Sequence, residues 1–322
     1  MNKVLCIGHT THDTFLLIER ADIYCNVNRK ECSVCFGFGD KVPVEKAVYG
    51  IGGGAANVSA GLAKLGLAPY LYTYLGNDNH GKFLRKELKK HKISIELVEE
   101  DKIPTDSSVI ISYDTDRTIF TYNHDRTFGY PKSLDGFDTV FVSSIGGKVS
   151  DVYDAVKEYK RLKPRALVAF TPGSKELSDS IDDVRSFVYS ADIFIGNIEE
   201  GIRVFNSDLE RSDVVLQDLL MDFHSKFNVI VVLTDGAKGV YICENGKFHH
   251  LESIPMKVIE KTGAGDAFAS GFLAGKIGGK TSIESAKWGI ANSISMMQRY
   301  GAHEGLLSKE NILGEVKKYW PN

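Results

Sequence analysis

The sequence has few cysteines, and their arrangement does not predict a disulfide framework. Only five occur in 322 residues, at positions 6, 25, 32, 35 and 243. An odd number, in a chain that opens without a secretion signal, argues against a disulfide network. Cys32 and Cys35 form one C-x-x-C pair, but a structural zinc site needs further ligands nearby and there is no second C-x-x-C. We therefore expect Cys25, Cys32 and Cys35 to be reduced cysteines in a surface segment.

The sequence also lacks an excess of positive charge and a long apolar run near its start. Its formal net charge is −3, and Lys and Arg do not gather into a basic stripe. Nucleic acid is therefore not expected as the main partner. The opening "MNKVLCIGHTTHD" contains an apolar run of only five residues. This run is too short for a signal peptide or a membrane span, so we expect a cytoplasmic protein with no membrane partner.

Two familiar phosphate-binding loops are missing. The segment nearest to a Walker A loop, "AGKIGGKT" at 274–281, begins with alanine and follows a helical pattern rather than a strand. The segment "GIGGGAAN" at 50–57 has Ala55 in place of the last glycine of G-x-G-x-x-G. It is also not followed by the acidic residue that a dinucleotide site requires. A P-loop and a dinucleotide-binding fold are therefore both disfavoured.

The rest of the sequence predicts a large α/β core. Hydrophobic residues make up 43% and charged residues 25%, which is typical of a globular protein. Short apolar runs alternate with helical patterns, which indicates a parallel sheet covered on both faces. The expected strands are 4–7, 70–74, 95–98, 140–142, 167–170, 193–195, 229–233 and 240–243, and the expected helices are 55–65, 81–91, 151–162, 180–189, 211–227, 264–275, 282–299 and 309–319.

Two early segments, roughly 10–50 and 105–125, do not follow this rhythm. They alternate in the way that half-buried strands do, and residues 107–113 and 118–123 are typical of a hairpin. We expect them to form a small β-sheet inserted in the α/β core. Ligands of open α/β sheets bind beyond the carboxyl ends of the strands, so a β-sheet near that edge would act as a lid.

Four glycine-containing motifs follow predicted strands or precede predicted helices. "GGGAANVSAG" at 52–61, "GNIEEG" at 196–201 and "LTDGAKG" at 233–239 each have an ordinary structural interpretation: a tight strand-to-helix connection, a helix cap and a hairpin turn. "EKTGAGD" at 260–266 is more specific, because Gly-Ala-Gly lets a ligand approach the backbone and a helix start offers free amides to an anion. An aspartate at such a site would take a proton from a group that attacks the anion.

Together these motifs resemble those of the ribokinase-like (PfkB) carbohydrate kinase family. The resemblance implies one domain over 1–322, with a three-layer α/β/α core, a mostly parallel sheet and a β lid over the sugar site. It extends from Gly8 to "RYGA" at 299–302. The matching residues are Gly52-Gly53-x-x-x-Asn57, Asn197-x-x-Glu200, Thr234-x-Gly236-Ala237-Lys238-Gly239 and Thr262-Gly263-Ala264-Gly265-Asp266-Ala267-Phe268.

The resemblance implies an ATP-dependent sugar kinase that uses Mg²⁺. Asp266 would be the catalytic base, and the amides of Gly263, Ala264, Gly265 and Asp266 would form an anion hole for the transferred phosphoryl group. Glu200 would organise Mg²⁺ through water. The acceptor would bind to Asp13, Gly53 and Asn57, and ATP to Asn197, Thr234, Gly236, Gly239 and Asn292.

The resemblance also implies a monovalent-cation site for K⁺ at Glu260 and Thr262, but two departures weaken it. The family usually has aspartate at the position of Glu260, and Gly305 stands where a hydroxyl ligand is common. The charge of Lys261 is expected to point to solvent.

Three questions about function stay open at this level. The acceptor could instead be a nucleoside such as adenosine, with Phe36, Phe38 or Tyr122 against its base, although aromatic residues in such strands more often form the core of a lid. A non-catalytic sugar-binding regulator is a weaker alternative, because Asp266, Asn197 and Glu200 are all present. Lid strands could also pair between two subunits to form a homodimer.

Overall fold

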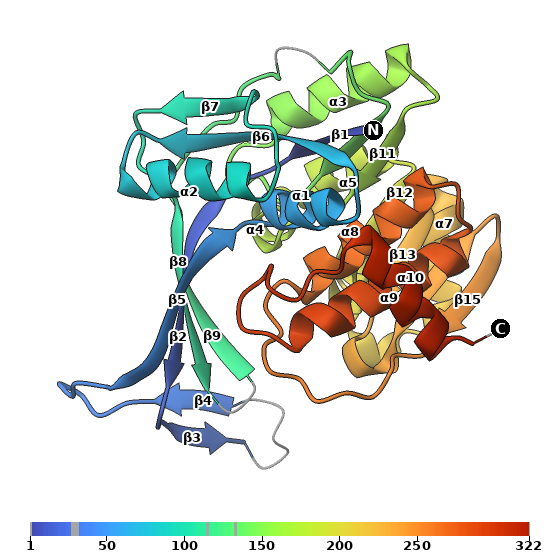
Figure 1. The fold of residues 1–322 in the computed structure, drawn as a ribbon. Coiled ribbons are helices and arrows are strands. Elements are labelled where there is room, and N and C mark those ends of the chain that lie inside the picture. Colours follow the sequence, from blue (N-terminus) through green and yellow to red (C-terminus); the bar gives the residue numbers. More distant parts are fainter. Residues whose placement is uncertain (1, 27–31, 114–115, 132–133, 322) are drawn as a thin grey trace.

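The core of the protein is a mostly parallel sheet with helices on both faces (Figure 1). The structure is a computed structural model, and it describes residues 2–26, 32–113, 116–131 and 134–321. Within these ranges the main sheet has nine strands, in the order β15-β14-β13-β12-β11-β10-β1-β6-β7. Neighbouring strands pair in parallel, except for the pairs β13-β14 and β14-β15, which are antiparallel. The strands are β1 (Lys3–Ile7), β6 (Ala68–Gly76), β7 (Val98–Asp101), β10 (Thr139–Val142), β11 (Leu167–Phe170), β12 (Ile193–Asn197), β13 (Ile230–Thr234), β14 (Val240–Glu244) and β15 (Lys247–Leu251).

The main sheet separates two hydrophobic cores, as the continuous apolar runs of its strands require. In β1, Val4 and Cys6 join one core, while Leu5 and Ile7 join the other. The predicted three-layer α/β/α architecture is therefore confirmed. None of the helices in the described ranges is long and apolar enough to cross a membrane. The first core is covered by α1 (Gly54–Lys64), α2 (Asn79–Lys90), α8 (Ala264–Ile277), α9 (Ser282–Met297) and α10 (Lys309–Tyr319), and the second by α3 (Ser150–Leu162), α4 (Ser174–Asp179), α5 (Ile181–Val188), α6 (Ile198–Phe205) and α7 (Leu216–Phe227).

A separate four-stranded sheet, which we call the small sheet, projects from one end of the core (Figure 1). Its order is β5-β2-β8-β9, and β2 pairs in parallel with β8 and antiparallel with β5. The predicted segments 10–50 and 105–125 supply these strands and a two-stranded hairpin, β3-β4. That the small sheet closes over a ligand stays a prediction. The strands are β2 (Thr11–Ile18), β3 (Asp22–Cys25), β4 (Cys32–Cys35), β5 (Val44–Gly52), β8 (Ser107–Tyr113) and β9 (Asp116–Tyr122).

Two element boundaries of the α/β core differ from the sequence prediction by about three residues or more. The strand expected at 95–98 begins at Val98 instead, because this edge strand pairs only with β6 and its acidic residues need no burial. The helix expected at 211–227 begins at Leu216, after a 3-10 turn over Arg211–Asp213. Two consecutive β-branched residues, Val214 and Val215, separate the turn from the helix, and such residues lose side-chain freedom in helical backbone.

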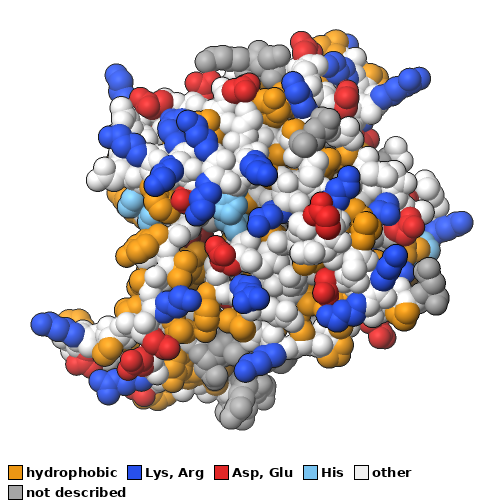
Figure 2. Space-filling model, viewed as in Figure 1, with side chains coloured by type: hydrophobic (Ala, Val, Ile, Leu, Met, Phe, Trp, Pro, Cys, Tyr) orange, Lys and Arg blue, Asp and Glu red, His pale blue; other side chains and the backbone are white. Residues whose placement is uncertain are grey.

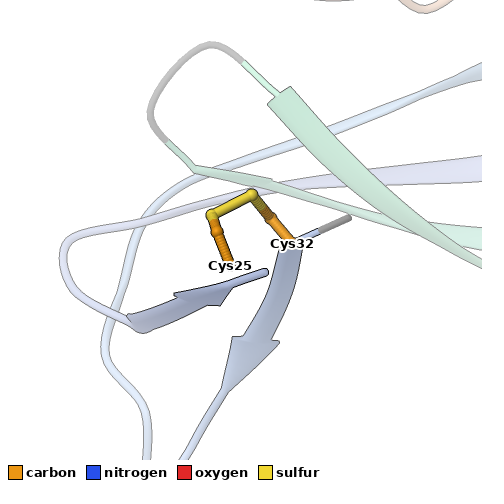
Figure 3. The surroundings of a disulfide bond; sticks show 2 residues. All are labelled: Cys25 and Cys32. Carbon is orange, nitrogen blue, oxygen red and sulfur yellow. A yellow bond between two sulfur atoms is a disulfide. The ribbon is translucent and has the colours of Figure 1, made fainter. Parts of the chain in front are cut away.

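The expectation of reduced cysteines is wrong for two of them. Cys25 and Cys32 form a disulfide in the β3-β4 hairpin (Figure 3). They are directly opposite each other in the antiparallel register, with their Cα atoms 4.0 Å apart. Counting cysteines could not show this pairing, because it depends on which residues face each other across the hairpin. Cys35 is free and exposed, while Cys6 and Cys243 are free and buried.

Candidate active site

The glycine-rich motif at 263–265 forms the start of α8, as predicted. Gly263 caps the helix in left-handed backbone, with φ at +82°. An added Cβ on Gly263 would lie 2.9 Å from the Cβ of Ala302, so glycine is required by conformation and by space. The first amides of a helix have no intrahelical partner. Of these amides, that of Ala264 donates to the Lys261 carbonyl at 3.1 Å. Gly265 borders open space, because a Cβ added there would meet no atom within 4 Å.

Asp266 lies in the first turn of α8 and points toward residues of the N-terminal half. The Asn57 side-chain amide donates to its Oδ2 at 2.8 Å, over 209 residues of sequence. Burial raises the pKa of Asp266 to about 6, and the nearby Asp13 carboxylate acts in the same direction. The Asn57 hydrogen bond and His9 act in the opposite direction. The carboxylate is therefore mainly ionised at neutral pH, but close enough to titration to accept a proton.

Asp13 is the second buried carboxylate of the site. It is 6% exposed and belongs to β2 of the small sheet. Thr11 Oγ1 donates to its Oδ1 at 2.7 Å, and Ser108 of β8 also bonds to it. Burial raises the pKa of Asp13 to about 6, although these hydroxyls oppose the shift. A Cβ at Gly52 would lie 2.1 Å from this carboxylate, so the glycine makes room for it.

The connection from β5 to α1 brings the backbone close to both carboxylates. Gly53 caps α1 with φ at +91°, and a Cβ there would lie 2.3 Å from the His9 carbonyl oxygen. A Cβ on Gly54 would lie 3.4 Å from Asp266 Oδ1. Of the predicted acceptor residues, Asn57 therefore contacts the predicted base, Asp13 acts on its charge, and Gly53 precedes the glycine beside it, although all three are distant from it in sequence.

Asn57 has a second partner that sequence reasoning missed. His303 Nε2 lies 2.8 Å from Asn57 Oδ1, and the histidine is 7% exposed. His303 follows "RYGA" in the loop between α9 and α10. A lone histidine in a loop carries no signal of its own, and this contact spans 246 residues.

Asn197 and Glu200 cap the N-terminus of α6, which is the ordinary structural role predicted for their motif. Asn197 Oδ1 accepts the Glu200 amide at 2.8 Å, and Glu200 Oε2 accepts the Asn197 amide at 2.9 Å. Burial is the main cause that raises the pKa of Glu200 to about 7, and Asp266 adds to it. The two carboxylates are therefore electrostatic neighbours. In the described part of the chain, no group of three or more His, Cys, Asp and Glu side chains is arranged to hold a metal ion.

A cavity of about 620 Å³ lies next to the start of α8, and Asp13, Asn57 and Asp266 are not among its lining residues. Its volume is within the usual range for sites of small molecules. Ala264 and Gly265 line one part, next to the turn after β13. The remaining lining is largely apolar. The residues concerned are Thr234, Gly236, Ala237, Gly239, Val240, Ser253, Ile254, Pro255, Met256, Val258, Lys261, Phe268, Ile290, Ser293, Ile294 and Met297.

One prediction for this region is confirmed and another needs correction. The Lys261 side chain is exposed, as expected, and it also lines the cavity, with its Nζ 3.4 Å from Asp116 Oδ2 of β9. Asn292 does not line the cavity, although its neighbour Ser293 does. Asn292 is 0% exposed, and its amide is used within the core. It donates to the Ala267 carbonyl and Ser270 Oγ and accepts the Leu307 amide.

Both carboxylate oxygens of Glu260, one of the two residues predicted to bind a monovalent cation, already accept hydrogen bonds from the protein. Its Oε1 accepts the amides of Lys261 and Thr262 at 2.9 Å each and the Thr262 hydroxyl at 2.8 Å. Its Oε2 accepts Ser112 Oγ of β8 at 2.7 Å. Arg117 Nε of β9 lies 4.0 Å from Oε1. Oε1 thus accepts three hydrogen bonds and has a cationic neighbour, which disfavours a monovalent cation at this oxygen.

Comparison with known proteins gives one family over nearly the whole chain. A family model described as "pfkB family carbohydrate kinase" matches residues 1–309. An ATP-dependent 6-phosphofructokinase from Thermoanaerobacterium thermosaccharolyticum is 26% identical, over 82% of this chain and 84% of its own length. A nucleoside kinase from Methanocaldococcus jannaschii is 25% identical, over 99% of this chain and 98% of its own length.

Solved structures share the fold at low sequence identity. A putative ribokinase from Agrobacterium tumefaciens has a TM-score of 0.82 at 16% identity, over 100% of this chain and 99% of its own. A putative ribokinase II from E. coli, in complex with ATP and Mg²⁺, has a TM-score of 0.75 at 17% identity, over 99% and 100%. A nucleoside kinase from Burkholderia thailandensis, in complex with inosine, has a TM-score of 0.77 at 15% identity, over 100% and 99%.

Proposed function

The chain belongs to the pfkB family of carbohydrate kinases, and from this premise we propose that it transfers the γ-phosphate of ATP to a hydroxyl of a small sugar. It is a phosphotransferase that acts on an alcohol group, and its acceptor is a sugar or a nucleoside. The observation that carries the proposal is the position of Asp266 at the start of α8, where it is hydrogen-bonded to Asn57 and follows Gly265, a residue that lines the cavity.

Asp266 is the catalytic base in this proposal. An acceptor hydroxyl held by Asp13 and Asn57 gives its proton to the carboxylate as its oxygen forms a bond to the γ-phosphorus. The bond from that phosphorus to the β,γ-bridging oxygen breaks, and ADP leaves. The free amides at the start of α8 donate to the oxygens of the transferred group, while Ala264 is already occupied by Lys261. Phosphoryl transfer asks for little covalent chemistry, so these positioned groups account for most of the protein's contribution.

The cavity beside Gly265 is the proposed ATP site. Thr234, Gly236 and Gly239 lie at the turn between β13 and β14, where the phosphates and ribose would be held. The apolar lining from Ile290, Ile294 and other residues suits the adenine ring. Lys261 adds a positive charge to the cavity wall, which favours an anionic ligand.

The residues near the phosphates fit Mg²⁺ that is held mainly by ATP and water. Glu200 Oε2 is engaged with the Asn197 amide, but this cap leaves Oε1 available to hold a coordinated water molecule. A hydrated ion suits a site with a single protein carboxylate, because Mg²⁺ loses its waters reluctantly. When bound with ATP, the ion would neutralise charge on the phosphates. A K⁺ site at Glu260 is not part of the proposal, because both of its oxygens already accept hydrogen bonds and Arg117 Nε lies 4.0 Å from Oε1.

A nucleoside acceptor is the second candidate. The M. jannaschii nucleoside kinase aligns with 99% of this chain, and three aromatic side chains, one in β9 and two in the segment between β4 and β5, are exposed and could contact a base. Phe36, Phe38 and Tyr122 are exposed, so the interpretation of these side chains as lid core is wrong. Tyr122 also contacts the His124 ring, with centroids 4.7 Å apart.

The exposed face of the small sheet also favours self-association. Hydrophobic side chains gather along this region in Figure 2, whereas charges of both signs are mixed over the rest of the visible face. Ile119, Phe120 and Tyr122 of β9 are all exposed. Because exposed edge strands with apolar residues tend to pair, a homodimer through the small sheet is proposed.

The test is ATP turnover with Mg²⁺ against a panel of pentoses, hexoses, sugar phosphates, keto-sugar acids and nucleosides. Formation of a phosphorylated sugar, lost in Asp266→Asn, would support the main proposal and identify the acceptor. Preference for a nucleoside would promote the second candidate. Tight sugar binding by calorimetry without turnover on any acceptor would instead indicate a non-catalytic binder.

A further inference from the structure

His303, Asn57 and Asp266 form a line of two hydrogen bonds that ends at the proposed base. Asn57 Nδ2 donates to Asp266 Oδ2, and Asn57 Oδ1 lies 2.8 Å from His303 Nε2. The three residues come from the loop after α9, from α1 and from α8. No local sequence constraint places them together, so the arrangement is made by the fold.

The polarity of this line follows from the chemistry of its ends. An ionised carboxylate only accepts hydrogen bonds, so the Asn57 group facing Asp266 must be its NH₂. The Asn57 group facing His303 is then the carbonyl oxygen, which also only accepts. His303 must therefore donate from Nε2. If Nε2 lost its proton, two acceptors would face each other, and the Asn57 amide would be free to turn its oxygen toward Asp266.

The surroundings of His303 keep it neutral. Burial lowers the pKa of His303 to about 3, and the nearby His91 and Lys64 act in the same direction. The His91 ring lies 5.0 Å from the His303 ring, at a tilt of 60°. A neutral histidine has one N–H, so donation from Nε2 fixes the tautomer.

The loop that carries His303 also supports the anion-hole end of α8. Ala302, the preceding residue, packs under Gly263. Farther along the loop, the Leu307 amide donates to the buried Asn292 side chain, which itself holds Ala267 of α8. The loop is therefore anchored to the same helix that presents Asp266, so that His303 has a fixed position relative to the carboxylate.

We propose that His303 is a positioning residue for the base: its Nε2–H fixes the Asn57 carboxamide so that the amide N–H is held against the Asp266 carboxylate. Its importance for catalysis rests on the proposed function, in which Asp266 accepts the acceptor's proton. The hydrogen bond to the ionised carboxylate favours that form over the protonated acid. Loss of His303 is then expected to leave Asp266 protonated to a higher pH.

Other charges act on Asp266 and must be kept constant in any test. His9, after β1, lies on one side and favours the ionised form, whereas Asp13 of β2 disfavours it. Glu200 of α6 is a further carboxylate neighbour. None of these residues contacts His303 in the hydrogen bonds described above. Replacement of His303 therefore changes the Asn57 contact while leaving these charges in place.

The experiment is a carbon-13 NMR titration of the Asp266 carboxyl in metal-free, aspartate-labelled protein, with Asp266→Asn used for assignment. The wild-type midpoint is expected at about 6. In His303→Leu, which removes the donor, the midpoint should rise by about one pH unit, the size expected for one charge-assisted hydrogen bond. In His303→Gln, whose amide can still donate to Asn57, it should stay near the wild-type value.

An Asp266 midpoint that stays at the wild-type value in folded His303→Leu would overturn the proposal and leave His303 a packing residue. If His303→Leu does not fold, nitrogen-15 NMR of the wild-type histidines decides: a neutral Nε2–H tautomer of His303 between pH 5 and 8 is expected, and an Nδ1–H tautomer or a protonated ring contradicts it. The titration needs no acceptor. A midpoint that moves while the acid limb of kcat/KM does not would support the positioning and contradict the base assignment.

Discussion

The two sides of the α8 start are built differently. On the acceptor side, Asp13 and Asn57 are buried, Asp266 is partly buried, and all three are already hydrogen-bonded to protein. On the nucleotide side, the cavity is lined mainly by apolar residues and by glycines in turns. The first arrangement sets the protonation and orientation of reacting groups, and the second provides space and shape. Changes on the acceptor side should therefore alter kcat and its pH dependence, whereas changes on the nucleotide side should alter the KM for ATP.

The largest effect is expected from Asp266→Asn. The variant keeps the shape of the side chain and can still accept the Asn57 hydrogen bond, but it cannot take up a proton. We expect kcat to fall by about 10²–10⁴-fold, with the KM for ATP little changed. Steady-state kinetics with saturating acceptor would measure both constants. Asp182→Asn, at an exposed position of α5, is the matched control. A rise in the KM for ATP with kcat preserved would contradict the distinction between the acceptor side and the nucleotide side.

A pair of glycine variants separates backbone strain from ligand contact. Gly263→Ala puts a Cβ into left-handed backbone and against Ala302, so the free energy of unfolding should fall by about 1–3 kcal/mol. Gly265→Ala points its Cβ into open space at the cavity, so stability should be preserved. Its KM for ATP should rise by about tenfold, because a phosphate contact is obstructed. Urea unfolding and ATP kinetics test the pair, and equal loss of stability in both would contradict it.

The pH dependence of stability gives a smaller effect with a defined sign. Burial raises the folded-state pKa of Asp266 from 3.8 to about 6. The folded protein therefore binds this proton more tightly than the unfolded chain, and the stability due to it is lost as pH rises between these values. Asp266→Asn removes the loss. Its melting temperature relative to wild type should rise from pH 4 to pH 7, and a difference that falls over this range would be inconsistent with the buried carboxylate.

Much of this architecture could be predicted because its determinants are local. Short sequence segments determine the apolar strands, the helix start at Gly263 and the cap formed by Asn197 and Glu200. The contact of His303 with Asn57 and the disulfide between Cys25 and Cys32 could not be predicted in the same way. Both depend on which distant or facing residues the fold brings together.

The corrections around the cavity have the same cause. The sequence predicts that Asn292 lies on a helix near the nucleotide, but it does not show which face of the helix the residue occupies. Packing between α8 and α9 turns its amide into the core and leaves Ser293 at the cavity. Similarly, the sequence does not show that Ser112 and Arg117 of the small sheet lie beside Glu260, where they interact with the carboxylate that a cation would need.

The smallest effect is expected from the choice of monovalent cation. Since both Glu260 oxygens already accept hydrogen bonds and Arg117 Nε lies 4.0 Å from Oε1, a further cation would be repelled there. Replacing K⁺ by Na⁺ at constant ionic strength should change kcat by less than about twofold, because long-range screening is then unchanged. Strong activation by K⁺, with a saturable concentration dependence, would show that the site near Thr262 rearranges to bind the ion.

The central claim is tested most directly by a single-turnover experiment with enzyme in excess over γ-labelled ATP. The acceptor is the panel member that the wild-type enzyme phosphorylates, and calorimetry measures ATP binding in parallel. The account predicts that Asp266→Asn binds ATP as the wild type does but forms phosphorylated acceptor at least about 100-fold more slowly. Product formation by the variant within about tenfold of the wild-type rate, with the same ATP affinity, would contradict the assignment of Asp266 as the catalytic base.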